Sequence, residues 1–127
     1  MGILEKRAEA LCFNCRAELD KICIPEILKC IEVIPIGEDA EKGILCIHHA
    51  DWWEYIDCLY ICPEYRRQGE AKKAVLEWYW KQSQTREIRL HIINKNKPAM
   101  RFWHKLFVLE EIEKNDVDTL YIIKKVK

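Results

Sequence analysis

The chain has 127 residues, of which 50% are apolar and 33% charged, a profile typical of one globular domain over residues 1–127. Its 21 Lys and Arg balance its 21 Asp and Glu, so no net charge would draw it to nucleic acid or to an anionic membrane. No apolar run reaches membrane-spanning length, and charge at Lys6 and Arg7 argues against a signal peptide, so we expect a cytoplasmic protein.

The seven cysteines are an odd number and lie in apolar segments, so we expect reduced thiols rather than a disulfide framework. Cys12 and Cys15 have the spacing of a metal or redox pair. Both fall on an apolar helical stripe, however, and no second pair matches them, which favours core packing. We therefore expect no metal site.

The first half of the chain predicts a helix and three strands. Apolar residues at spacings of three and four from Leu4 to Ile22 indicate an amphipathic helix. Ile31–Ile36 reads as a strand, and the polar segment Gly37–Gly43 as a hairpin loop. Strand-like runs follow at Ile44–His48 and Tyr55–Cys62, and antiparallel pairing is the simplest interpretation.

The second half predicts two helices and three strands. After a basic turn at Arg66–Gly69, a helix presents the apolar face Ala71, Ala74, Val75, Trp78 and Gln82. A β-branched strand follows at Glu87–Ile93. Asn96 is the expected N-cap of a helix that buries Ala99, Phe102, Trp103 and Leu106, and two strands near 108–113 and 119–126 end the chain. This order predicts an α+β fold with helices packed on one mixed sheet.

The turn before the first of these two helices has the features of an anion site. A strand that leads through Arg66–Ala71 directly into a helix presents backbone N–H groups at the positive end of the helix dipole. Gly69 and Ala71 are small, and Arg66, Arg67, Lys72 and Lys73 add positive charge. By pattern alone, an ordinary solvated basic turn explains these residues equally well.

Two longer motifs extend this pattern. The segment Ile56–Ala71 resembles the strand-and-loop signature of GNAT N-acetyltransferases, in which Gln or Arg, two residues, Gly, one residue, and Gly or Ala follow a strand; Arg66, Gly69 and Ala71 fill these places. The segment Asn96–Trp103 is similar to the second GNAT signature, Asn-x-x-Ala-x-x-Phe followed by an aromatic residue. The resemblance covers residues 54–108.

The resemblance implies a GNAT-like mixed central sheet of about six strands with flanking helices, and acetyl-CoA as co-substrate. Main-chain groups of Leu59, Tyr60 and Ile61 would pair with the pantetheine arm in a wedge between two splayed parallel strands. The pyrophosphate would lie on the loop made by Arg66, Arg67, Gln68, Gly69, Glu70 and Ala71. Asn96 would hydrogen-bond the cofactor from the other side, on the helix that carries Ala99, Phe102 and Trp103.

The sequence departs from the family pattern in three places. It begins with a helix, so the first family strand is missing and one sheet edge is bare or covered by a partner such as a second copy. Phe107-Val108 replaces the usual Gly-Phe and removes the residue suited to a left-handed helix end. Trp103 stands where a tyrosine often protonates the CoA thiolate, which an indole cannot do.

The reaction that the resemblance implies is direct attack of a primary amine on acetyl-CoA. Glu54 and Asp57 are the candidate bases, although a strand carboxylate is often only a solvated charge. His48 and His49 should point to opposite faces of their strand, and Trp52 and Trp53 would either pack or line an acceptor pocket. The alternative is a catalytically inactive acyl-CoA-binding regulatory module, which Trp103 would permit.

Overall fold

A computed structural model of the protein describes residues 32–50, 52–82 and 86–127. The predicted helix over residues 4–22 lies outside these residues. So do the position of the first family strand and four of the seven cysteines. The described chain divides into two units. The first unit contains the residues up to His49 and those from Asp57 to Gln82, and the second contains Ala50–Ile56 and the residues after Gln82.

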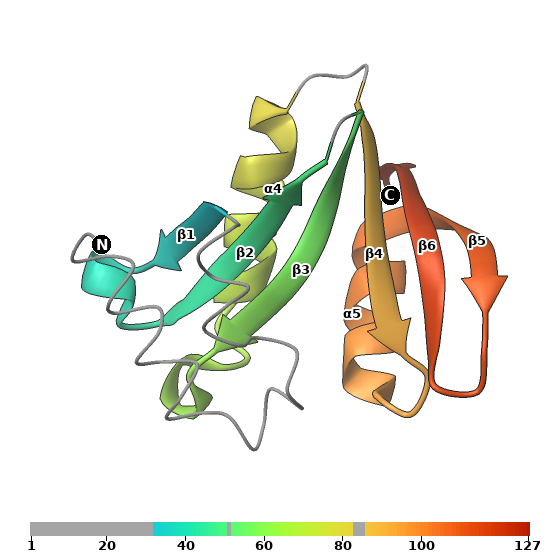
Figure 1. The fold of residues 1–127 in the computed structure, drawn as a ribbon. Coiled ribbons are helices and arrows are strands. Elements are labelled where there is room, and N and C mark those ends of the chain that lie inside the picture. The colour runs from blue at the N-terminus through green and yellow to red at the C-terminus, as the bar shows by residue number, and fades with distance from the viewer. Residues whose placement is uncertain (1–31, 51, 83–85) are drawn as a thin grey trace. The chain divides into compact units, whose positions relative to one another are not determined.

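In the described residues, six strands form one mixed sheet in the order β1-β2-β3-β4-β6-β5 (Figure 1). The strands are β1 (Glu32–Ile36), β2 (Gly43–His49), β3 (Trp53–Ile61), β4 (Glu87–Ile93), β5 (Phe107–Lys114) and β6 (Asp118–Val126). The helices are α4 (Glu70–Lys81) and α5 (Lys97–Leu106), with short 3-10 turns η1 (Glu38–Ala40) and η2 (Pro63–Tyr65). The predicted mixed sheet with flanking helices is therefore confirmed.

In the first unit, β1 and β2 pair antiparallel, and α4 lies along the sheet with Val75 and Trp78 buried (Figure 1). The predicted hairpin loop joins the antiparallel strands β1 and β2, and it contains η1, in which Asp39 and Ala40 adopt positive φ. A further difference concerns Gln82, which is the C-cap of α4 rather than part of its apolar face. Its side-chain amide donates back to the carbonyl of Trp78 at 3.2 Å.

Three buried cysteines contribute to the core of the first unit. They belong to a cluster of buried side chains from η1, β2, β3 and the residue that follows β3: Ala40, Ile44, Cys46, Cys58, Tyr60 and Cys62. Burial along β3 alternates strictly, so one of its faces is buried and the other is half-exposed.

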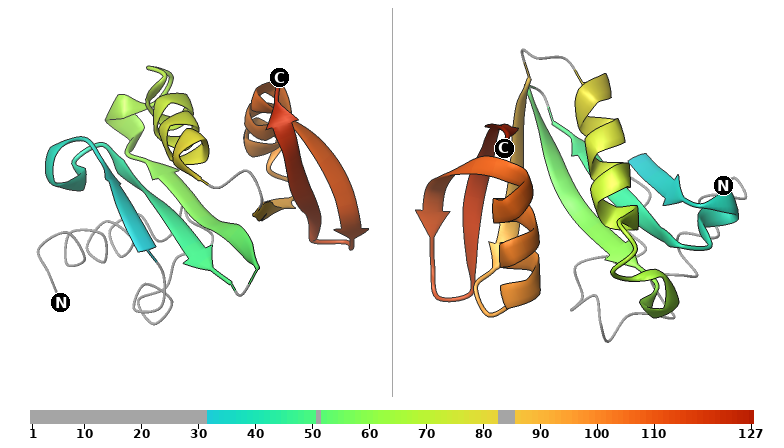
Figure 2. Two further views of the ribbon diagram at one scale, coloured as in Figure 1. Left: turned by 90° about the horizontal axis from the view of Figure 1, so that it is seen from above. Right: turned by 180° about the vertical axis from the view of Figure 1, so that it is seen from behind.

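In the second unit, the start of β3 pairs parallel with β4, from Trp53 opposite Glu87 to Ile56 opposite Leu90. The strand β6 joins β4 and β5 by antiparallel pairing, and α5 lies along β4 and β6 (Figure 2). The predicted N-cap of α5 is confirmed, because the side-chain oxygen of Asn96 accepts a hydrogen bond from the amide of Ala99 at 3.1 Å.

The helix α5 ends without a left-handed residue. Phe107 has extended dihedral angles, φ −130° and ψ 155°, so the chain passes directly from α5 into β5. This agrees with the replacement of the usual glycine by Phe107. Among the described residues, we find no helix with the length and apolar character needed to span a bilayer.

Trp103 is one of the two buried residues of α5, and its replacement tests this packing. It is 6% exposed, and its ring stacks on Phe107 with 6.2 Å between centroids. We expect Trp103→Ala to lower the free energy of unfolding by about 3 to 5 kcal/mol, because it leaves a large cavity. The control is Trp80→Ala, since Trp80 is 62% exposed and should change stability by less than about 0.5 kcal/mol. Urea denaturation of both variants measures the difference, and equal losses would contradict it.

Candidate active site

The segment between β3 and α4 leaves main-chain groups open at the start of the helix. Gly69 occupies the N-cap with φ 80° and ψ 6°, and no side chain caps the helix there. The first amides of a helix have no partner within the helix, so they remain donors for solvent or for a ligand. A Cβ placed on Gly69 would meet no atom within 4 Å. An anion could therefore approach the main chain at this point.

Two side chains of this loop fold back and brace it. The Arg66 Nε donates to the carbonyl of Ile61 at 2.8 Å, and its guanidinium lies 5.3 Å from the ring centroid of Tyr60. The side-chain amide of Gln68 donates to the carbonyl of Glu64 at 3.0 Å. Both contacts tie the loop to the end of β3 and to η2.

The loop and the first turn of α4 carry further charged residues. Three of them are exposed and positive: Arg67, Lys72 and Lys73. Glu70, the first residue of α4, is held by Lys42 with 3.1 Å between Nζ and Oε1. Sequence reasoning did not identify Lys42, because nothing local to the loop before β2 indicates a partner 28 positions away.

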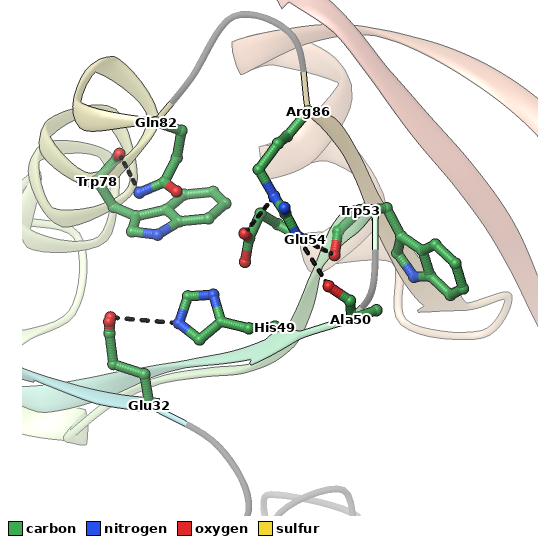
Figure 3. A network of polar contacts seen from close by, with 8 residues as sticks. All are labelled: Glu32, His49, Ala50, Trp53, Glu54, Trp78, Gln82 and Arg86. Atoms are coloured by element: carbon green, nitrogen blue, oxygen red, sulfur yellow. Dashed lines mark hydrogen bonds and ion pairs between the residues drawn. The ribbon is translucent and has the colours of Figure 1, made fainter.

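Glu54, one of the two candidate bases, is buried in an ion pair with Arg86. Its side chain is 5% exposed, and its Oε1 lies 2.8 Å from the Arg86 Nε (Figure 3). The Nη2 of the same arginine donates to the carbonyls of Ala50 at 2.7 Å and Trp53 at 3.3 Å. Glu54 therefore takes part in closing the turn between β2 and β3. Sequence reasoning missed Arg86, which lies just before β4 in a segment without a recognisable pattern.

Asp57, the other candidate base, has a different environment. The alternation of β3 puts it on the half-exposed face, opposite to Glu54. Its Oδ2 is buried and has no hydrogen-bond partner in the part of the chain that the structure describes. Burial raises the pKa of Asp57, and the electrostatic interaction with His48 opposes this effect in part. A carboxylate with raised proton affinity is suited to accept a proton from an amine.

His49, Trp52 and Trp53, the other polar and aromatic candidates, make contacts of their own. His49 Nε2 lies 3.6 Å from Glu32 Oε1 in the first unit (Figure 3). In the second unit, the rings of Trp52 and Trp53 meet edge to face at 4.7 Å, and the Arg89 guanidinium lies 5.0 Å and 4.8 Å from them. Arg89 was not identified from the sequence. A role of this aromatic pair in acceptor binding stays a prediction.

The residues of the second signature share α5 in the second unit. The Asn96 oxygen is used by the helix cap, which leaves its side-chain amide nitrogen as a donor for a ligand. Ala99 and Phe102 are half-buried, and the Phe102 ring meets Trp103 edge to face at 5.0 Å. The loop residues of the first signature are brought together in the first unit.

The sequence matches the Acetyltransferase (GNAT) family over residues 26–107, which is more than half of the chain. The chain therefore belongs to the GNAT acetyltransferase family. Comparison with curated protein sequences gives no match.

Solved structures share the fold. Arabidopsis thaliana NAA60 in complex with a bisubstrate analogue is 17% identical, with a TM-score of 0.62 over 93% of this chain and 90% of that one. The same plant protein in complex with acetyl-CoA gives 17% identity and a TM-score of 0.61 over 95% of each chain. A protein described as a GNAT-family acetyltransferase from Bacteroides thetaiotaomicron is 16% identical, with a TM-score of 0.60 over 93% of this chain and 83% of that one. The predicted GNAT-like fold is confirmed.

The Glu54–Arg86 pair can be tested by removing one charge and then both. We expect Arg86→Met to cost about 3 to 5 kcal/mol of unfolding free energy, because it removes the cation that lies beside the buried Glu54 carboxylate. The double variant with Glu54→Met should lose less than the single one, since no buried charge remains. The exposed Lys124–Glu110 pair, 3.1 Å apart, is the control, and Lys124→Met should cost less than about 1 kcal/mol. Chemical denaturation gives all three values, and a double variant as unstable as Arg86→Met would contradict this account.

Proposed function

We propose that this protein transfers the acetyl group of acetyl-CoA to a primary amine by direct attack, without an acetyl-enzyme. The observation that carries the proposal is the open left-handed turn at Gly69, directly before α4, in a chain of the GNAT family. The NAA60 structures, of an acetyl-CoA complex and a bisubstrate complex, support it by their shared fold.

The proposed cofactor contacts divide between the two signatures. The pyrophosphate lies on the main chain of the loop from Arg66 to Ala71. The exposed cations Arg67 of this loop and Lys72 and Lys73 of α4 lower the cost of holding its charge. The pantetheine arm runs along Leu59, Tyr60 and Ile61, after the last β3–β4 pair. Asn96 donates to the cofactor through its side-chain nitrogen, and the side chains of Ala99, Phe102 and Trp103 contact it.

We assign the role of base to Asp57 rather than Glu54. Glu54 is neutralised by Arg86, whereas the Asp57 carboxylate is desolvated and takes up a proton more readily. In the reaction, the amine nitrogen forms a bond to the thioester carbonyl carbon and the carbon–sulfur bond breaks. Asp57 takes the proton released by the amine, and the CoA thiolate takes a proton from water.

The proposal also covers the domain, the compartment and the oligomeric state of the protein. One domain over residues 1–127 performs the reaction in the cytoplasm, as a monomer or as a homodimer that covers a sheet edge. β1 and β5 lie at the two ends of the described sheet. The identity of the acceptor requires a screen of peptides, polyamines and small amines.

The rival function is an acyl-CoA-binding regulatory module without turnover. Trp103 favours it, because an indole at this position supplies no acid to the departing thiolate. Incubation of the protein with acetyl-CoA and a panel of amines separates the two. Acetylated product above the rate without protein supports the enzyme, whereas normal acetyl-CoA binding without product supports the module.

Gly69→Asn tests the cofactor loop. Asparagine tolerates left-handed dihedral angles, so the ligand-free melting temperature should change little, while its side chain enters the open space beside the main chain. In the parent protein, CoA at a hundred times its dissociation constant should add about 2.7 kcal/mol of stability. We expect thermal unfolding of the variant to show no such gain. A variant that keeps its full response to CoA would contradict the proposed pyrophosphate site.

Asp57→Asn tests the base through activity and stability together. Turnover should fall about 100-fold or more with unchanged CoA affinity, because the base is lost. The folded protein binds the Asp57 proton more tightly than the unfolded chain, so this carboxylate lowers stability at neutral pH and the penalty vanishes at low pH. The variant should therefore melt higher than the parent at pH 7, and this gain should shrink toward about pH 4.

The control for this variant is Asp116→Asn, because Asp116 is exposed and should affect neither turnover nor the melting temperature. Parent turnover in Asp57→Asn would remove Asp57 from the mechanism.

A further inference from the structure

Glu70 introduces a negative charge where the proposed site must bind phosphates. It is the first residue of α4 and follows the uncapped Gly69 directly. The helix dipole and the open amides stabilise a carboxylate at this position for the same reason that they stabilise a phosphate. An unneutralised Glu70 would therefore compete with the ligand for these donors and repel it.

Lys42 neutralises the charge of Glu70 through an ion pair. Its Nζ lies 3.1 Å from the Glu70 Oε1, and both side chains are largely shielded, at 30% and 21% exposure. The ammonium also lies 5.8 Å from the ring centroid of Tyr65 in η2. Lys42 thus neutralises the carboxylate from the side of the preceding loop.

The backbone of Lys42 is held in place independently of Glu70. Its amide donates to the carbonyl of Ile36 at 3.0 Å, at the end of β1. Its carbonyl accepts from the amide of Cys62 at 2.8 Å, just after β3. The main chain of Lys42 is therefore held between the ends of two strands, and its side chain reaches the start of α4 from there.

We propose that Lys42 is a positioning residue for the phosphates of acetyl-CoA, which acts by neutralising Glu70 and holding its carboxylate off the amides that follow Gly69. The inference rests on the proposed function, because it assumes that this loop binds the cofactor. It adds a residue outside both family signatures and explains how an acidic side chain is tolerated within an anion site.

An ordinary structural ion pair between a loop and a helix makes a different prediction. If the pair only stabilises the fold, loss of either partner weakens the loop, and both single variants bind CoA less tightly. If Lys42 acts through Glu70, loss of Lys42 weakens CoA binding, whereas loss of Glu70 leaves it equal or tighter. The response of CoA binding to the loss of Glu70 therefore separates the two accounts.

The test is the dissociation constant of CoA, measured by isothermal titration calorimetry on the full chain at low salt. Lys42→Met should weaken binding about fivefold, and Glu70→Gln should leave it equal or tighter. The double variant should bind like Glu70→Gln, because the lysine has no function once the carboxylate is gone. Lys42→Arg, which keeps the charge, should bind like the parent. The effect of Lys42→Met should shrink as salt is added.

Weaker binding in both single variants, or a double variant as weak as Lys42→Met, would overturn the inference and leave the cofactor site in place. Absence of CoA binding by the parent would overturn the proposed function and this inference together. Melting temperatures without ligand show whether each variant is folded.

Discussion

The passage from β3 into α4 is the constraint on which the candidate site depends. The chain must leave the sheet and begin a helix with its first amides open, which requires left-handed dihedral angles at Gly69 and also at Arg67, with φ 63°. Glycine adopts these angles without penalty, whereas a residue with a Cβ such as Arg67 is strained. The hydrogen bonds of Arg66 to Ile61 and of Gln68 to the Glu64 carbonyl hold this strained turn from both sides.

Local patterns predicted the elements that local forces determine. The β-branched run at Glu87–Ile93 became β4, and Asn96 caps α5 as its position before Lys97 and Pro98 indicated. Details were missed where local signals are weak. The hairpin loop contains the 3-10 turn η1 with positive φ at Asp39 and Ala40, which a polar segment does not reveal. Gln82 ends α4 with extended dihedral angles, and its side chain bonds back to the Trp78 carbonyl.

The residues of the candidate site could be predicted from the sequence, but the ion pairs that they form could not. Gly69 and Arg66 could be recognised because the family motif is contiguous in sequence. The partners of Glu70 and Glu54 could not, since Lys42 and Arg86 reach them only through tertiary packing. Burial likewise decides between two carboxylates on one strand, and a strand pattern indicates which face each occupies but not what covers that face.

Glu54 and Asp57 show why the surroundings of a buried carboxylate matter for the mechanism. A buried carboxylate is tolerated when a cation neutralises it, and Arg86 does this for Glu54 while bonding two carbonyls of the adjoining turn. A carboxylate held by a cation in this way has a structural role, whereas a base needs an oxygen that can accept the proton of the amine. The desolvation of Asp57 lowers stability at neutral pH and raises its pKa, opposed only in part by His48. Residues that reduce stability persist where function needs them, and for this reason we propose Asp57, rather than the other carboxylate of β3, as the base.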